Sequence, residues 1–166
     1  MRIHTNPIEG PMNIAIFVYS HTGNTLSAAN RLKEHLEKSG NKVTLASIKA
    51  VDENPNVTKV VLTQIPDPKP YDRLILATPV HGFQVPAVMK AYVNQMPVLK
   101  DKPVSLFVTH AFPFAWMGGK PAIKMLKDLL APKQVSVKAT AIINSSKKES
   151  DIINMLTGFS EESSWS

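Results

Sequence analysis

The 166-residue sequence contains no cysteine, so disulfides, thiolate metal ligands and cysteine nucleophiles are excluded. No apolar run approaches the ~18 residues of a membrane span. The opening residues, MRIHTNPIEGP, lack the hydrophobic segment of a secretory signal. We therefore expect a cytoplasmic protein that engages no membrane. Residues 1–11 resemble a leader or an expression scar, with Met12 as the natural start.

The sequence also lacks a dense basic stretch, although its net charge is +6. Its longest basic run is Lys147-Lys148, whereas nucleic-acid binding usually shows a basic stripe with interleaved aromatics. We therefore expect no nucleic-acid partner, and the scattered charge could instead attract an acidic protein. The five histidines show no His-x-x-x-His spacing and no Gly-x-Ser-x-Gly elbow occurs. No metal site or hydrolase nucleophile is predicted.

What the sequence does contain is a regular alternation of apolar β-rich runs and helical stripes. Uninterrupted apolar runs are typical of strands buried on both faces of a parallel sheet. Strict alternation predicts an α/β fold, a doubly wound three-layer sandwich in one domain over residues 12–160, followed by a frayed tail at 161–166. The expected strands are 13–19, 42–48, 71–79, 103–112 and 135–144, with helices over 27–38, 88–96, 123–130 and 152–159.

The least regular segment is 49–70. Its apolar residues predict one short helix bracketed by Pro55 and Pro66: Val57, Val60, Val61 and Ile65.

Polar residues follow the first predicted strand, and in doubly wound folds ligands bind beyond the carboxyl ends of the strands. The unpaired N–H groups of the next helix should point into the same space, so hydroxyls, an amide and a glycine there predict an anion site, with phosphate as the obvious ligand. The alternative is an ordinary capped turn. The spacing matches neither a P-loop nor the dinucleotide fingerprint. The six residues are Ser20, His21, Thr22, Gly23, Asn24 and Thr25.

Ser-x-Thr-Gly-Asn-Thr directly after the first strand resembles the phosphate loop of flavodoxins, which bind flavin mononucleotide (FMN). The resemblance implies a five-stranded sheet in the order 2-1-3-4-5 and an FMN phosphate held by residues 20–25. It also implies that the loop starting at Thr78-Pro79 lines the isoalloxazine ring, with contacts from Val80, His81, Gly82 and Phe83. The Gly82 carbonyl would approach N5 of the flavin. The alternative is a plain turn before a helix starting at Pro86.

The loop after the fourth strand is crowded with His and aromatic residues. Such a loop usually covers something, and a planar ring is a suitable partner for stacking, although the loop could instead fold over the local core. No tyrosine lies between Thr109 and Gly119, unlike in many flavodoxins, and the chain is basic where classic flavodoxins are acidic. The predicted flavin contacts here are His110, Phe112, Phe114, Trp116 and Gly118.

The resemblance implies an FMN-binding electron-transfer protein with redox partner proteins, acting as a monomer or dimer. The alternative on the same fold is an NAD(P)H-dependent quinone or nitro-compound reductase. A phospho-receiver domain shares the architecture but needs an acidic cluster after the first strand and an Asp after the third. Those positions hold Tyr19-Ser20 and Thr78.

Overall fold

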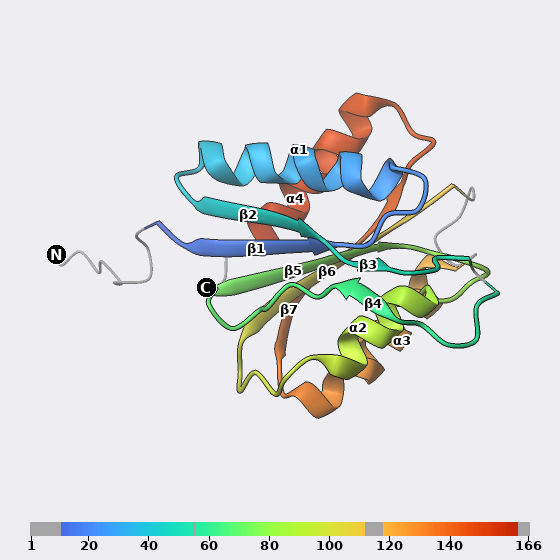
Figure 1. The fold of residues 1–166 in the computed structure, drawn as a ribbon. Coiled ribbons are helices and arrows are strands. Elements are labelled where there is room, and N and C mark those ends of the chain that lie inside the picture. Colours follow the sequence, from blue (N-terminus) through green and yellow to red (C-terminus); the bar gives the residue numbers. More distant parts are fainter. Residues whose placement is uncertain (1–10, 55, 112–117, 163–166) are drawn as a thin grey trace, which may run out of the picture.

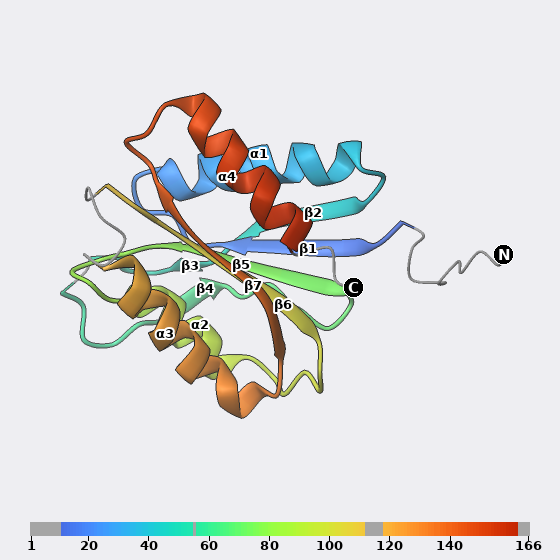
Figure 2. The same ribbon diagram turned by 180° about the vertical axis from the view of Figure 1, so that it is seen from behind.

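The computed structural model describes residues 11–54, 56–111 and 118–162. A twisted sheet lies between two layers of helices, with α1 and α4 on one face and α2 and α3 on the other (Figures 1 and 2). The helices are α1 (Asn24–Lys38), α2 (Ala87–Gln95), α3 (Gly119–Leu130) and α4 (Glu149–Glu162), and a short 3₁₀ helix (Ala131–Lys133) follows α3. The three-layer sandwich is as predicted. None of the described helices has the length and apolar character needed to cross a membrane.

The main sheet has five strands, and every neighbouring pair runs parallel. Its spatial order is β2-β1-β5-β6-β7, which is 2-1-3-4-5 when these five strands are counted along the chain, as expected. The strands are β1 (Asn13–Val18), β2 (Lys42–Ser47), β5 (Arg73–Pro79), β6 (Pro103–His110) and β7 (Ser136–Asn144).

The apolar run of β1 serves two cores because successive side chains of a strand point to opposite faces. Ile14, Ile16 and Val18 belong to the cluster under α1 and α4, whereas Ala15 and Phe17 belong to the cluster under α2 and α3. β5 and β6 are buried along nearly their whole length in the same way. This two-sided burial explains the lack of polar alternation in these runs.

The helix predicted within 49–70 is wrong. The segment forms β3 (Lys49–Ala50) and β4 (Leu62–Gln64), which pair antiparallel as a separate two-stranded sheet. The Asp52 carboxylate accepts a hydrogen bond from the N–H of Asn54, and the Asn54 amide oxygen accepts one from Asn56. Such side-chain bonds to nearby backbone compete with helix formation and favour turns.

Several boundaries also differ from the sequence prediction. α1 begins at Asn24, so Asn24 and Thr25 belong to its first turn rather than to the loop. α3 begins at Gly119, four residues before the predicted start, and α4 continues to Glu162.

Candidate functional site

Three loops meet at the carboxyl edge of the sheet: the β1–α1 loop, the β5–α2 loop and the segment after β6. β5 lies between β1 and β6, with Val18 paired to Ala77 and Pro79 paired to Thr109. Because parallel strands end at the same edge, the loops that follow them are neighbours. The described parts of the three sequence segments singled out above therefore lie at one candidate site.

The β1–α1 loop is closed by the hydroxyl of Ser20. Its Oγ accepts hydrogen bonds from the N–H of Gly23 at 3.1 Å and of Leu26 at 3.2 Å. Gly23 has φ +95°, and its carbonyl accepts the first helical bond, from Ser27 at 2.9 Å. This left-handed backbone is readily adopted by glycine. Ser20 and Gly23 together set the direction in which α1 leaves the sheet.

The side chains of this loop divide into exposed and buried ones. His21, Thr22 and Asn24 are exposed, as is Gly23. Thr25 is 1% exposed, and its hydroxyl shares a 2.7 Å hydrogen bond with that of Thr109. The Thr25 hydroxyl is therefore engaged inside the protein, and toward a ligand this residue can offer its backbone N–H.

Backbone N–H groups around the start of α1 are candidates to bind an anion. Within the described parts of the chain, the N–H groups of Thr22, Asn24 and Thr25 have no hydrogen-bond acceptor. Those of Asn24 and Thr25 lie in the first turn of α1, where no intrahelical partner exists. They contribute to the positive end of the helix dipole, which favours an anion.

The β5–α2 loop contains a two-residue turn. His81 and Gln84 exchange two backbone hydrogen bonds of 2.9 Å, and the residues between them, Gly82 and Phe83, have φ +53° and +65°. Positive φ at both central positions is the pattern of a type I′ turn. Phe83 is a non-glycine residue in this conformation and is 50% exposed, so the turn presents an aromatic face at the edge of the site.

The start of the same loop is turned into the protein. Thr78 is fully buried, and its hydroxyl donates to the carbonyl of Pro79 at 3.1 Å. Pro79 and Val80 are half-buried. Thr78 therefore shapes the loop rather than presenting its hydroxyl at the surface.

His81 is surrounded by other rings. Its imidazole makes edge contacts with His21, at a centroid distance of 5.7 Å, and with Tyr19, at 6.3 Å. Burial first, and then the charge of His21, lower the pKa of His81. Burial, with a smaller contribution from Glu53, raises the pKa of Tyr19 to about 12. At pH 7 the site therefore presents a neutral imidazole beside a protonated phenol.

The segment after β6 is described at its two ends. The His110 side chain is buried, and its carbonyl accepts hydrogen bonds from the N–H and the hydroxyl of Ser145. At the other end, a Cβ added to Gly118 would lie 2.9 Å from Val80 and 3.2 Å from the Phe83 ring. Gly118 thus packs directly against the β5–α2 loop. The predicted contacts Phe112, Phe114 and Trp116 lie outside the described residues.

Two residues of the site were not among those predicted from the sequence. Tyr19 directly follows β1, and its ring contacts that of His81. Thr109 forms hydrogen bonds to Thr25 and to Val80, which belong to two different segments of the site. Thr109 directly follows the mostly apolar run VSLFV, so the sequence does show a hydroxyl-bearing residue at the end of this strand. Its partner, 84 positions away, cannot be read from that signal.

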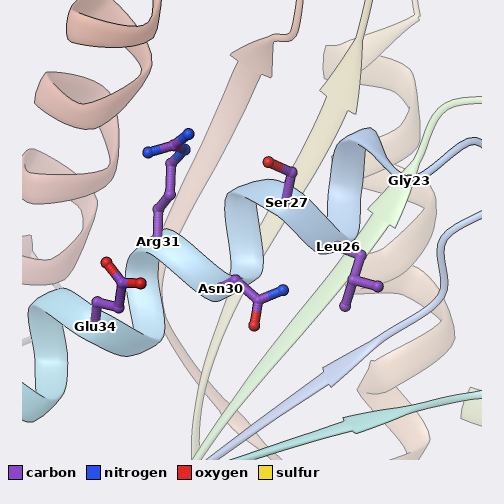
Figure 3. A pocket seen from close by; sticks show the side chains of 6 residues that line it. All are labelled: Gly23, Leu26, Ser27, Asn30, Arg31 and Glu34. Atoms are coloured by element: carbon purple, nitrogen blue, oxygen red, sulfur yellow. The ribbon is translucent and has the colours of Figure 1, made fainter.

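Two cavities lie beside the site. A shallow one of about 400 Å³ runs along the outer side of α1, and all its lining residues belong to that helix and its cap, so nothing encloses it (Figure 3). A smaller one of about 80 Å³ is lined by four elements or their ends and includes Asn24, Ser27, Thr109 and Ser145. The second lies between α1, α4 and the ends of β6 and β7, and the buried Thr109 forms part of its wall.

We predict that Gly23→Ala destabilises the flavin-free protein by about 1–2 kcal/mol, because an L-residue is strained in the left-handed conformation. No atom lies within 4 Å of the added Cβ, so the penalty is conformational rather than steric. Urea unfolding measures it. Gly158→Ala is the matched control: Gly158 is helical with equally open surroundings, and its substitution should stabilise the fold by about 0.5–1 kcal/mol. Equal effects at both positions would contradict the role of the Gly23 backbone.

The His81 imidazole should titrate below its ordinary pKa in the flavin-free protein, and His21→Ala should move that pKa upward by removing a repelling cation. Two-dimensional NMR of the imidazole resonances across pH 4–9 follows each histidine, and His81→Gln assigns the signal. A His81 pKa at or above the ordinary value would show that the imidazole is not desolvated as the structure indicates.

Comparisons with known proteins agree with this architecture. A family model described as NADPH-dependent FMN reductase matches residues 12–148. No curated protein matches the chain. One similar solved structure is a flavodoxin from Streptococcus pneumoniae TIGR4, with 18% identity and a TM-score of 0.67 over 92% of this chain and 97% of that one. Another is flavodoxin 1 from Bacillus cereus, with 14% identity and a TM-score of 0.67 over 93% of this chain and 99% of that one. A short-chain flavodoxin associated with a bacterial microcompartment is also similar, with 18% identity and a TM-score of 0.68 over 91% of this chain and 95% of that one. The TM-scores establish a shared flavodoxin-like fold, and the match over residues 12–148 makes the chain a member of the NADPH-dependent FMN reductase family.

Proposed function

We propose that this chain binds FMN at its three carboxyl-edge loops and transfers electrons through it. The observation that carries the proposal is the convergence of an uncharged, donor-rich helix start with a turn that presents aromatic rings. The first suits a phosphate and the second suits a planar ring system. Both the family match and the similarity to flavodoxins support a flavin as the ligand.

The residues present fit an FMN phosphate. The N–H groups of Thr22, Asn24 and Thr25 and the hydroxyl of Thr22 would donate to it, since these residues lie at the start of α1 and the Thr22 and Asn24 side chains are exposed. The space beside Gly23 is open, so a ligand can approach the backbone closely. No Lys or Arg belongs to the loop, and the donors are neutral.

The isoalloxazine would lie against the turn at Gly82 and Phe83. Gly118 packs against Val80 and Phe83 of the same loop. The Tyr19 ring, directly after β1, contacts the His81 ring at the start of the turn. Phe112, Phe114 and Trp116 stay candidates for stacking on the ring. FMN, when bound, supplies reversible transfer of one or two electrons, while the protein sets affinity and access. A neutral His81 would leave that edge of the ring uncharged.

Two roles fit an FMN protein of this shape. The first is an electron carrier between protein partners, supported by coverage of 97% and 99% of two flavodoxin chains. The second is an NADPH-dependent reductase, supported by the family model. The two differ in whether NADPH alone can reduce the flavin, because a reductase needs a nicotinamide pocket beside the ring.

FMN should bind more tightly than riboflavin, because only FMN carries the phosphate. Thr22→Ala should weaken FMN binding by roughly 1.5–3 kcal/mol, the range for a charge-assisted hydrogen bond, and leave riboflavin binding nearly unchanged. Fluorescence titration of the flavin-free protein measures both affinities. Thr157→Ala, on α4 and away from the loops, serves as the control. Riboflavin binding as tightly as FMN would contradict the phosphate site.

Reduction by NADPH separates the two roles. As a carrier, the FMN-loaded protein should be reduced slowly by NADPH alone and rapidly when a flavin-dependent reductase is added. Anaerobic stopped-flow absorbance near 450 nm follows both reactions. Fast reduction by NADPH alone, with turnover on a quinone, would instead identify a reductase.

A further inference from the structure

We propose that Thr109 is a positioning residue that holds the β1–α1 loop and the β5–α2 loop in register for the flavin. This inference rests on the proposed FMN site and assigns a function to a residue that would not touch the ligand. Thr109 lies next to the last position of β6, and its side chain is 2% exposed.

The side chain of Thr109 connects to the phosphate loop. Its hydroxyl and that of Thr25 are 2.7 Å apart, and Thr25 is 1% exposed. A buried hydroxyl pair of this kind satisfies two polar groups at once, and removing one leaves the other without a partner. Thr25 is the second residue of α1, so the bond fixes the helix turn whose N–H groups face the proposed phosphate.

The backbone of Thr109 connects to the other loop. Its carbonyl accepts a 3.0 Å hydrogen bond from the N–H of Val80, the residue that precedes the turn beginning at His81. The next carbonyl along β6, that of His110, binds Ser145 at the start of the β7–α4 connection. The end of β6 therefore links loops that follow three other strands.

The small cavity explains why this link matters. About 80 Å³ of space lies beside Thr109, with Asn24 and Ser27 of α1 forming part of its wall. Close packing does not hold the first turn of α1 on that side. The directional bond between Thr25 and Thr109 takes over this role, because a hydrogen bond fixes distance and angle where van der Waals contact is missing.

The test measures FMN and riboflavin affinities for the parent, Thr109→Val, Thr109→Ser and Thr25→Val. Thr109→Val keeps the shape and removes the hydroxyl, so FMN affinity should fall about tenfold while riboflavin affinity falls less than twofold. Thr109→Ser should restore FMN affinity to within about threefold of the parent. Thr25→Val should match Thr109→Val, and the double variant should lose little more, since both changes break one bond.

Thr44→Val on β2 is the control for loss of a threonine hydroxyl from the sheet, and it should change neither affinity. Equal losses for FMN and riboflavin in Thr109→Val would overturn the positioning role, as would failure of Thr109→Ser to rescue. If Thr109→Val does not fold, Thr25→Val and Thr109→Ser still give the same comparison. A parent that binds neither flavin, or binds both equally, refutes the proposed function instead.

In the flavin-free protein, amide NMR gives a readout that does not depend on flavin binding. Thr109→Val should shift the amide resonance of Gly23, because it removes the bond to Thr25, whereas the Val80 amide should move little, because it keeps its bond to the carbonyl of residue 109. Thr25→Val should shift Gly23 and leave Val80 nearly unmoved. A Thr109→Val spectrum in which Gly23 stays in place would overturn the proposal.

Discussion

The constraint on which the structure depends is the two-sided burial of β1, β5 and β6. Backbone N–H and C=O groups in such strands have no access to water, so they must pair with neighbouring strands. The five parallel strands satisfy this requirement. Three of their connections pass through α1, α2 and α3 on the two faces of the sheet, whereas β3 and β4 lie in the connection from β2 to β5. All the loops that leave the carboxyl ends are consequently brought to one edge.

At that edge, the polar groups of the loops form hydrogen bonds with one another or with the end of β6. The Ser20 hydroxyl accepts hydrogen bonds from Gly23 in its own loop and from Leu26 in α1. The Thr25 hydroxyl bonds to that of Thr109, and the carbonyls at the end of β6 accept bonds from Val80 and Ser145. Loops normally tolerate movement because few contacts hold them. Here hydrogen bonds between segments far apart in sequence fix their relative positions, which is the preorganisation that a binding site needs.

The alternation of strands and helices was predicted from local patterns, and the sheet order from the resemblance of one loop to flavodoxins. Apolar runs identified the central strands, whereas the polar sequence before α1 hid the true start of that helix at Asn24, three residues before the predicted one. The β3–β4 pair was missed because its strands are two and three residues long and exist only through pairing across about a dozen residues. The prediction for Thr25 treated it as one of six loop donors. Whether the Thr25 hydroxyl bonds to a ligand or to Thr109 depends on a residue 84 positions away in the sequence. A local sequence pattern carries no information about that partner.

The charge distribution explains why anion binding at the β1–α1 loop depends on the exact position of its backbone. The chain has net charge +6, yet the β1–α1 loop contains no Lys or Arg. Arg31, two turns into α1, pairs with Glu149 of α4. An anion at the loop would be held by N–H and hydroxyl dipoles, whose attraction depends steeply on distance and orientation, rather than by a flexible cation that can follow its partner. A site without Lys or Arg therefore requires a fixed backbone. Gly23, which gives the loop its left-handed turn, and Thr109, which anchors the first turn of α1, each supply part of that rigidity.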